Sequence, residues 1–219
     1  MKKDIVTAVI AVIVLHVMFG LVYPLATTGV AQVVFPAAAN GSKVTVDGKL
    51  YGSRLLGADF RKPELDAKGQ PKKDKTGNPI LDPDPRYFQE RPSATVPEYN
   101  PAATAFSNLG PNNKATLTAI QGNLQTYLAL EKPYVPGLTA AQVPVDAVDS
   151  SASGVDPHIS EANADVQAHR IAAVRSLSLA RVMKLIADHT DGRSLGILGE
   201  PGVNVLELNL ALDREAATR

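Results

Sequence analysis

From Ile5 to Ser42 the chain carries no Lys, Arg, Asp or Glu, although charged residues make up 20% of the whole sequence. Within this run, residues 5–22 are aliphatic, Met or Phe at all but three positions. A helix needs about 20 mostly apolar residues to cross roughly 30 Å of hydrocarbon. We therefore predict a single transmembrane helix over residues 5–25.

A cleaved signal peptide is the alternative interpretation of this run. Met1-Lys2-Lys3 would be its basic start, and Gly29-Val30-Ala31 would be its cleavage site. However, the apolar part of a signal peptide is usually about 7–15 residues long, and this one is longer. Tyr23-Pro24 also resembles a helix end at a membrane interface, an aromatic residue followed by a helix breaker. These features favour a retained anchor.

The flanks of the helix predict its orientation. Two lysines precede it, and no Lys or Arg follows until Lys43. Cytoplasmic flanks are enriched in basic residues. We therefore expect residues 1–4 in the cytoplasm, residues 26–42 as an uncharged connector, and residues 43–219 as one extracytoplasmic mixed α/β domain.

Composition narrows the possible functions of this domain. The formal net charge of the chain is zero, so a nucleic-acid partner has no support. There is no cysteine, which agrees with a domain that needs no disulfide outside the cell. A segment of this length suits one soluble domain. We detect no obvious internal repeat.

Turn residues and hydrophobic periodicity predict the elements of this domain. Asp47-Gly48 between two β-rich runs predicts a hairpin, and residues 61–86 predict a solvated polar loop. Three helices are expected, from a cap at Asn112 or Asn113 to about residue 131, after a cap at Ser160, and from about residue 178 to 189. Residues 203–212 alternate, with Leu at every second position from Leu206 to Leu212, which predicts a strand.

Enzyme motifs in the sequence are weak. Asp74-Lys75-Thr76-Gly77-Asn78 nearly matches the phosphorylation loop of P-type ATPases, but it lies in a Lys- and Pro-rich loop without a buried strand before it. Ser151 and Ser153, with the chain's histidines, leave a membrane-anchored serine hydrolase as an alternative, although no Gly-x-Ser-x-Gly elbow occurs. No metal-ligand or nucleotide signature is present, and a solute-binding accessory domain is the third alternative.

Ordered phrases along almost the whole chain resemble the C subunit of the bacterial Kdp potassium-transporting ATPase. The phrases are Tyr23-Pro24-Leu25, Thr28-Gly29-Val30-Ala31-Gln32, Ala39-Asn40-Gly41-Ser42, Tyr87-Phe88-Gln89, Arg91-Pro92-Ser93-Ala94, Ser107-Asn108-Leu109-Gly110-Pro111-Asn112, Ser153-Gly154-Val155-Asp156-Pro157-His158-Ile159-Ser160, Leu198-Gly199-Glu200-Pro201 and Val203-Asn204-Val205-Leu206-Glu207-Leu208-Asn209.

The resemblance implies a non-catalytic subunit of a potassium importer in the bacterial inner membrane. Its expected partners are a channel-like A subunit, a P-type ATPase B subunit, a small F subunit and membrane lipid. The family is described as a catalytic chaperone that raises the ATP affinity of the B subunit, and also as an element at the outer mouth of the A subunit. No cofactor is expected on this chain, and ATP is implied only through the B subunit.

Eight residues are candidates for contacts with these partners. His16 is the one ionisable group inside the predicted span, where such a residue is a functional candidate by default. The others lie near the interfacial end of that helix or in polar turn phrases of the domain. The full set is His16, Gly20, Tyr23, Ser107, Asn108, Gly110, Asp156 and His158.

Overall fold

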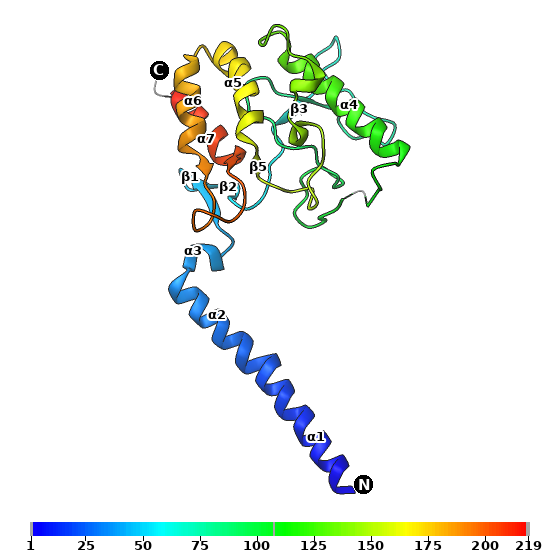
Figure 1. Cartoon of the computed structure of the whole chain (residues 1–219), viewed down its shortest axis with the longest axis vertical. Helices are drawn as coiled ribbons and strands as arrows, with labels where there is room; N and C mark the ends of the chain where they lie inside the picture. The colour runs from blue at the N-terminus through cyan, green and yellow to red at the C-terminus, as the bar shows by residue number, and fades with distance from the viewer. Residues whose placement is uncertain (1, 107, 218–219) are drawn as a thin grey trace. The chain divides into compact units, whose positions relative to one another are not determined.

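One continuous helix runs from Lys2 to Val34 in the computed structural model, which describes residues 2–106 and 108–217 (Figure 1). It consists of α1 (Lys2–Val17), the π-helical turn η1 (Met18–Val22) and α2 (Tyr23–Val34). The π turn has a local cause. Pro24 has no N–H to donate to the carbonyl of Gly20, and its ring crowds that carbonyl. The preceding turn widens, and the N–H of Tyr23 bonds the carbonyl of Met18, five residues earlier.

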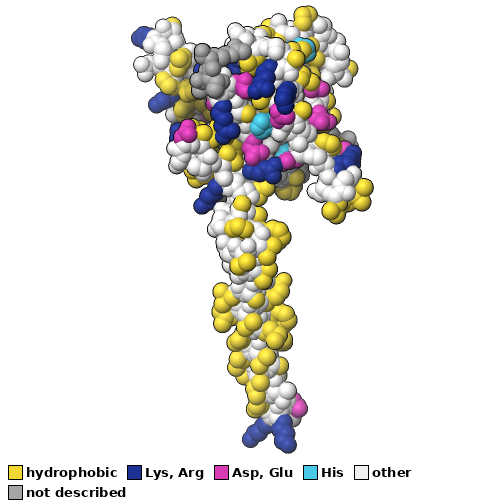
Figure 2. Space-filling model, turned by 90° about the vertical axis from the view of Figure 1, so that its left-hand side faces the viewer, with side chains coloured by type: hydrophobic (Ala, Val, Ile, Leu, Met, Phe, Trp, Pro, Cys, Tyr) yellow, Lys and Arg dark blue, Asp and Glu magenta, His cyan; other side chains and the backbone are white. Residues whose placement is uncertain are grey.

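The sequence suggested that the helix ends near Pro24, but in the structure it continues past this residue. The chain absorbs the proline in a single π turn and stays helical to Val34. Figure 2 shows hydrophobic side chains along this helix on the visible face, with the basic side chains at its free end. The helix is long and apolar enough to cross a membrane. The boundaries 1–4, 5–25 and 26–42 stay predictions.

The N-terminal compact unit, Met1–Ser53, also contains the predicted hairpin. A short helix, α3 (Pro36–Ala39), is followed by β1 (Lys43–Val46) and β2 (Lys49–Ser53), which pair antiparallel. Asp47 and Gly48 have φ angles of 50° and 76°, as a two-residue turn between twisted strands requires. The second strand ends at Ser53 and does not continue into residues 54–57.

The polar loop at 61–86 is an ordered lobe in the second unit, Arg54–Arg219. Its root is the antiparallel ribbon of β3 (Arg61–Pro63) and β4 (Leu81–Pro83). Beyond the root, three backbone segments meet in a cycle of hydrogen bonds. The N–H of Glu64 donates to Ile80, that of Ile80 to Lys72, and that of Lys72 to Glu64, at 2.7–2.9 Å.

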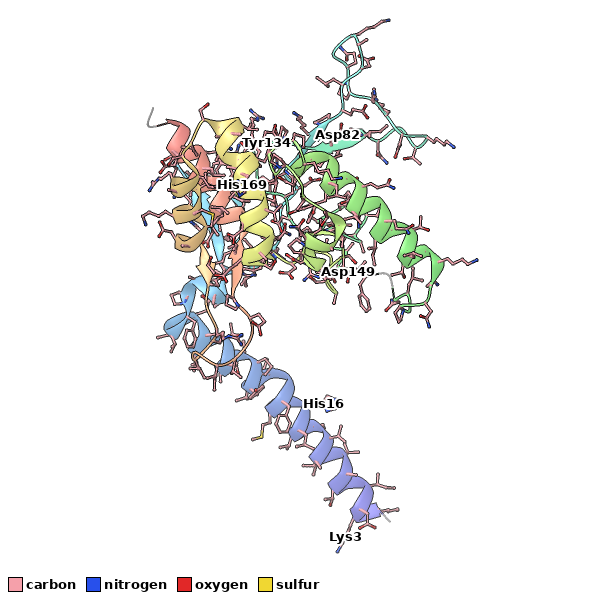
Figure 3. All side chains as sticks on the ribbon, turned by 45° about the horizontal axis from the view of Figure 1, so that its top comes forward. Lys3, His16, Asp82, Tyr134, Asp149 and His169 are labelled. Atoms are coloured by element: carbon pink, nitrogen blue, oxygen red, sulfur yellow. The ribbon has the colours of Figure 1, made fainter. Side chains whose placement is uncertain are left out.

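Two tips with the same construction extend from this three-way junction, and Figure 3 shows them as separate loops beyond Asp82. They span 66–71 and 74–79, and both have the pattern Asp-x-x-Gly-x-Pro, a short repeat that our sequence analysis missed. In each tip the aspartate Oδ1 accepts two backbone N–H groups, at 2.8 and 2.9 Å. These local bonds replace a hydrophobic core, which is why the lobe holds its shape while exposed.

The rest of the second unit packs helices around a small antiparallel sheet. The strand order is β5 (His158–Ile159), β7 (Gly202–Asn204) and β6 (Thr190–Asp191), with β7 in the centre. The helices are α4 (Lys114–Glu131), α5 (Glu161–Arg175), α6 (Leu179–Asp188) and α7 (Val205–Ala217), and two short 3₁₀ turns, Ala140–Gln142 and Val145–Ala147, lie between α4 and β5.

The two predicted caps, Asn113 (from the pair Asn112 or Asn113) and Ser160, are confirmed. Asn113 accepts the N–H of Ala115, and Ser160 accepts that of Asn163. Ser178 caps α6 in the same way, through Arg181. Each cap satisfies an N–H group that has no partner inside its helix.

The predicted strand at 203–212 is wrong beyond Asn204. Residues from Val205 onward form α7, and its described side chains are buried on nearly every side as far as Leu212. A helix that is buried on all sides lacks the 3.6-residue period of apolar residues by which helices are recognised. The alternating leucines were therefore the only visible pattern, and that pattern indicates a strand. The overlooked signal is Asn204, whose Oδ1 accepts the N–H of Glu207, a helix-capping pattern.

Candidate functional site

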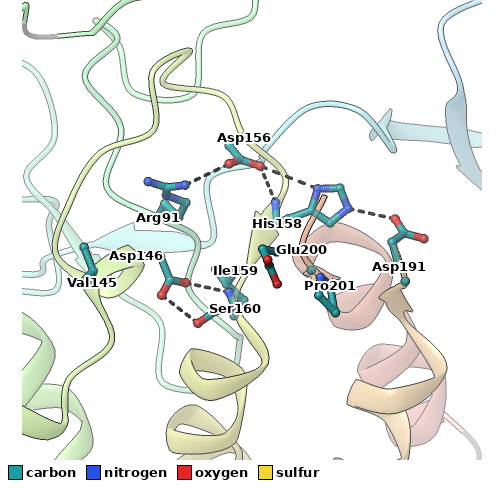
Figure 4. A pocket seen from close by; sticks show the side chains of 12 residues that line it. Arg91, Val145, Asp146, Asp156, His158, Ile159, Ser160, Asp191, Glu200 and Pro201 are labelled. Carbon is teal, nitrogen blue, oxygen red and sulfur yellow. Dashed lines mark hydrogen bonds and ion pairs between the residues drawn. The ribbon is translucent and has the colours of Figure 1, made fainter. Parts of the chain in front are cut away.

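An open cleft of about 530 Å³ lies beside the small sheet, and we call it the His158 cleft (Figure 4). Strand β5 contributes His158, strand β6 contributes Asp191, and the segment before β5 contributes Asp156. Asp146 and Arg91 line the side that Figure 4 places at the left. The cleft is therefore lined mainly by charged groups that the fold brings together from distant parts of the chain.

His158 lies between two carboxylates. Its Nε2 is 3.0 Å from Asp191 Oδ2, and its Nδ1 is 3.7 Å from Asp156 Oδ1. The side chain rests against the central strand, where a Cβ on Gly202 would lie 3.1 Å from the Cβ of His158. The absence of a side chain at Gly202 thus allows the imidazole to reach from β5 to β6 across β7.

Both carboxylates are also held by arginines. Arg91 Nη1 lies 3.3 Å from Asp156, and Arg54 lies 2.6 Å from Asp191 and 3.2 Å from Glu207. The result is one continuous network, Arg91–Asp156–His158–Asp191–Arg54–Glu207, in which positive and negative groups alternate when His158 is protonated. Such a network fixes the positions of the loops and strands that carry its members.

This pairing shifts the pKa of each central group. The Asp156 carboxylate raises the pKa of His158 above its ordinary 6.5; burial opposes this effect and Asp191 adds to it. Burial alone would raise the pKa of Asp156 and of Asp191. The bonds from His158 and the neighbouring arginine charges outweigh burial, so both carboxyl pKa values are lowered.

A buried carboxyl group, Glu90, lies behind the network. Burial raises the pKa of Glu90 to about 8, while the N–H of Ala58, which donates to Glu90 Oε1 at 3.0 Å, partly opposes this. The Asp156 charge adds to the rise. Gly57 is required here by close packing, since a Cβ would lie 2.8 Å from Glu90 Oε2 and 2.9 Å from the Asp156 carbonyl oxygen.

The carboxylates of the cleft are already used within the protein. Asp146, for example, accepts the N–H and the hydroxyl of Ser160 at 2.8 Å and the amide of Asn163 at 3.1 Å. Among residues 2–106 and 108–217, no group of three His, Asp or Glu side chains is placed to hold a metal ion. The arrangement is suited to holding a surface in one shape and to responding to pH.

We expect replacement of His158 by glutamine to remove a pH-dependent part of the stability. Because the folded-state pKa of His158 is raised, its contribution is fully present below pH 6.5 and is lost as pH rises through the raised value. The stability difference between wild type and His158→Gln should therefore shrink from pH 6 to alkaline pH. Chemical unfolding of the full chain in detergent at a series of pH values measures it.

Glu90 titrates in the same range, and the His158 charge lowers its pKa, so its contribution differs between the two proteins. A Glu90→Gln background provides the matched control and should leave the trend in place. A wild-type advantage that stays constant, or grows, as pH rises would contradict the assigned pairing of His158 with Asp156 and Asp191.

The structure separates the sequence-predicted site residues into three places. Asp156 and His158 meet in the His158 cleft, whereas Asn108 lines another hollow of about 500 Å³ beside the start of α4. Gly110 ends the same segment, and its carbonyl accepts the N–H of Asn113. Ser107 lies outside the described residues.

The remaining candidates lie on the long apolar helix of the N-terminal unit, Lys2–Val34. His16 donates from Nδ1 to the carbonyl of Val12 at 2.8 Å, so its ring has a partner within its own helix. Figure 3 labels it on that helix. Gly20 is in the π turn, where an added Cβ would meet nothing within 4 Å, and Tyr23 is exposed. Their role in partner contact stays a prediction.

The two enzyme-like motifs have structural explanations. The hydroxyls of Ser151 and Ser153 accept backbone N–H groups of their own turn, and both ring nitrogens of His158 face carboxylates. Asp74 holds its tip as Asp66 holds the other, although the sequence around Asp66 does not resemble an ATPase loop. Residues 74–78 therefore resemble a phosphorylation motif because they carry the residues of a tight turn.

Several members of the network were missed from the sequence. The sequence analysis named neither Asp191 nor Arg54 as a candidate site residue. Glu90 carried no signal at all. Their partners are 32 to 153 residues away along the chain, as in the pairs Glu90–Ala58 and Arg54–Glu207, so no local pattern marks them.

Comparison with known proteins now gives the family. A family model described as "K+-transporting ATPase, c chain" matches residues 5–214. The chain belongs to the KdpC family. This confirms the resemblance found in the order of the motifs.

Curated KdpC relatives agree over almost the full length. Proteins named "Potassium-transporting ATPase KdpC subunit" are 45% identical over 214 residues in Polaromonas naphthalenivorans and 45% over 207 residues in Sorangium cellulosum, covering 97% and 94% of this chain and 95% of each relative. One from Mycobacterium tuberculosis is 41% identical over 214 residues, covering 98% of this chain and all of the relative.

Proposed function

We propose that this chain is a non-catalytic subunit of an ATP-driven potassium-transporting complex in a bacterial plasma membrane. Its N-terminal helix anchors it, and its domain lies on the outer face, where it supports assembly and access of the ion to a channel-like subunit. The observation that carries this proposal is the KdpC family match over residues 5–214, in a chain whose long apolar helix has basic residues only at its start.

The chemistry of the domain supports an accessory role. Arg91, Asp156, His158 and Asp191 of the cleft are linked to one another. The hydroxyls of Ser151 and Ser153 accept backbone N–H groups of their own turn. In the proposed orientation the domain cannot touch ATP in the cytoplasm. An effect on the ATP affinity of a catalytic subunit would then reach that subunit through the membrane-embedded parts of the complex.

Co-purification tests membership in the complex. We expect a tagged copy of this chain, extracted in mild detergent, to bring down the channel-like subunit and the P-type ATPase subunit encoded by the same organism. Deleting the chain should abolish most of the potassium-stimulated ATPase activity of the purified membranes. Recovery of the chain alone, together with unchanged activity after its deletion, would contradict the proposal.

Cysteine labelling tests the orientation separately, and the chain is suited to it because it contains no cysteine. We expect Ser42→Cys to react with a membrane-impermeant maleimide in intact spheroplasts. Lys3→Cys should react only after permeabilisation. The reverse pattern would place the domain in the cytoplasm and favour direct contact with the nucleotide-binding subunit.

A further inference from the structure

The loop between β6 and β7 carries an apolar tip that the proposed function has not used. Leu195 is 89% exposed, Ile197 76% and Leu198 57%, so three neighbouring aliphatic side chains face solvent in the isolated chain. We name these three side chains the 195–198 tip. Large aliphatic groups that cluster on a surface mark an interaction site more often than chance exposure.

The tip is a preformed structure. The backbone groups of Ser194 and Leu198 exchange two hydrogen bonds at 2.8 and 2.9 Å, which closes a narrow hairpin. Arg193 crosses its base, where it donates to the carbonyl of Gly199 at 2.6 Å and pairs with Glu200 at 2.5 Å. The aliphatic side chains are thus held in position, and the nearest basic group is neutralised.

Leu195 occupies an unfavourable backbone conformation. Its φ is 55°, and that of Gly196 is 77°, as in a turn where Asn-Gly is the preferred pair. Among the described non-glycine residues with positive φ, Leu195 is the only aliphatic one. An exposed leucine in this conformation is unfavourable for two reasons. Its apolar side chain is in contact with water, and its Cβ is crowded by the left-handed backbone. A use for its side chain would explain why it is present.

Arg54, the first residue of the second unit, contacts the chain on both sides of the β6–β7 loop. The second unit begins at Arg54, whose guanidinium pairs with Asp191 just before the loop. The carbonyl of Arg54 accepts the side-chain amide of Asn204 just after the loop, at 2.8 Å. Both ends of the loop are therefore fixed to Arg54.

These observations favour a protein occupant over lipid. Segments that bind a bilayer surface combine apolar side chains such as Trp, Phe or Leu with free Lys and Arg, whereas this tip has no aromatic residue and its arginine is paired. A fluid bilayer also requires no fixed shape, whereas a protein pocket benefits from a rigid, preorganised group. Charge-depleted, apolar groups are typical of the buried centre of a protein interface.

We infer that the 195–198 tip docks into an apolar pocket on the outer face of a membrane-embedded subunit of the potassium-transporting complex. This inference rests on the proposed function and adds to it a contact surface on this chain. The tip supplies the buried centre of the contact, and the charged side chains of the His158 cleft lie at its edge, since Glu200 and Gly202 belong to both the cleft and the loop end.

Leu195→Asn separates this role from folding. Asparagine suits the left-handed conformation better than leucine, so the melting temperature of the variant chain in detergent should equal or exceed that of wild type. Recovery of the membrane-embedded subunits by the tagged variant should fall about tenfold or more, because each 1.4 kcal/mol of lost contact energy is a factor of ten. Ile197→Asn should act in the same direction.

The matched control is Leu65→Asn, which removes another exposed aliphatic side chain, 56% exposed, from the polar lobe. It should leave recovery unchanged. If wild type recovers the subunits and Leu195→Asn recovers them equally well, the docking inference is wrong and the proposed function stands. If wild type recovers none, the proposed function itself fails.

A polarity-sensitive dye identifies the occupant. Leu195→Cys labelled with such a dye should report an aqueous environment when the full chain is alone in lipid nanodiscs, and an apolar one in the assembled complex. The same dye at Leu65→Cys should stay aqueous in both. An apolar signal from position 195 with the chain alone would make the bilayer the occupant and overturn the inference.

Discussion

Replacing Arg170 by methionine is expected to lower the free energy of unfolding by about 3–5 kcal/mol, because it removes one partner of a buried ion pair. The side chains of Arg170 and Glu131 are both 0% exposed, and Arg170 Nε lies 2.9 Å from Glu131 Oε1. Burial raises the pKa of Glu131, and the Arg170 charge opposes that rise. Without the guanidinium the carboxyl group is left without its charge partner in an apolar interior.

The guanidinium also holds groups outside the ion pair. Its Nη1 donates to the carbonyls of Pro85 and Tyr87 at 2.6 and 2.9 Å, and its Nη2 donates to Gln167 at 2.9 Å. Methionine fills similar space but satisfies none of these acceptors. Each buried acceptor that loses its partner adds a penalty of its own.

Denaturant unfolding of the full chain in detergent measures the effect, and Lys184→Met is the matched control. Lys184 pairs with Asp188 one turn along α6, and both side chains are largely exposed. Such a pair contributes roughly 0.5 kcal/mol or less. A loss below about 1 kcal/mol for Arg170→Met would show that the buried pair does not hold α5 against α4, since removing one partner of a buried pair is normally far more costly.

The sequence predicted the parts of the fold that short-range chemistry determines. The hairpin followed from Asp47-Gly48, and the first three helices of the domain followed from their caps and apolar periodicity. Arg170 shows the limit of this reasoning. It follows the exposed His169 on α5, and nothing in the local sequence marks it as buried, but it binds Glu131 and two carbonyls of a distant segment in the interior.

The candidate site was predictable only as fragments. The phrase around Asp156 and His158 stood out as a cluster of turn and polar residues, and the structure places both in the cleft. Arg54 and Asp191 complete their network from opposite ends of the domain sequence. Pairing across such separations is decided by the path of the chain, which no pattern within a short window contains.

Asn209 distinguishes most clearly between the strand predicted from the sequence at 203–212 and the helix α7 of the structure. In the predicted strand its side chain faced solvent, and a change to leucine would alter stability by no more than about 0.5 kcal/mol. In the structure Asn209 is 0% exposed and bonds a single residue twice. Its Oδ1 accepts the N–H of Phe88 at 2.9 Å, and its Nδ2 donates to the carbonyl of Phe88 at 2.9 Å.

Asn209→Leu is therefore expected to destabilise the domain by about 2–6 kcal/mol, because the buried N–H and C=O of Phe88 each lose a partner at about 1–3 kcal/mol. Leucine keeps the branched shape of asparagine and is somewhat larger, so the loss cannot come from a cavity and would come mainly from the unpaired polar groups. Gln121→Leu, on the exposed face of α4, is the control and should stay within about 0.5 kcal/mol of wild type. Equal stabilities for the two variants would favour the strand and contradict the buried helix, since only the helix places the side chain of Asn209 against the backbone of Phe88.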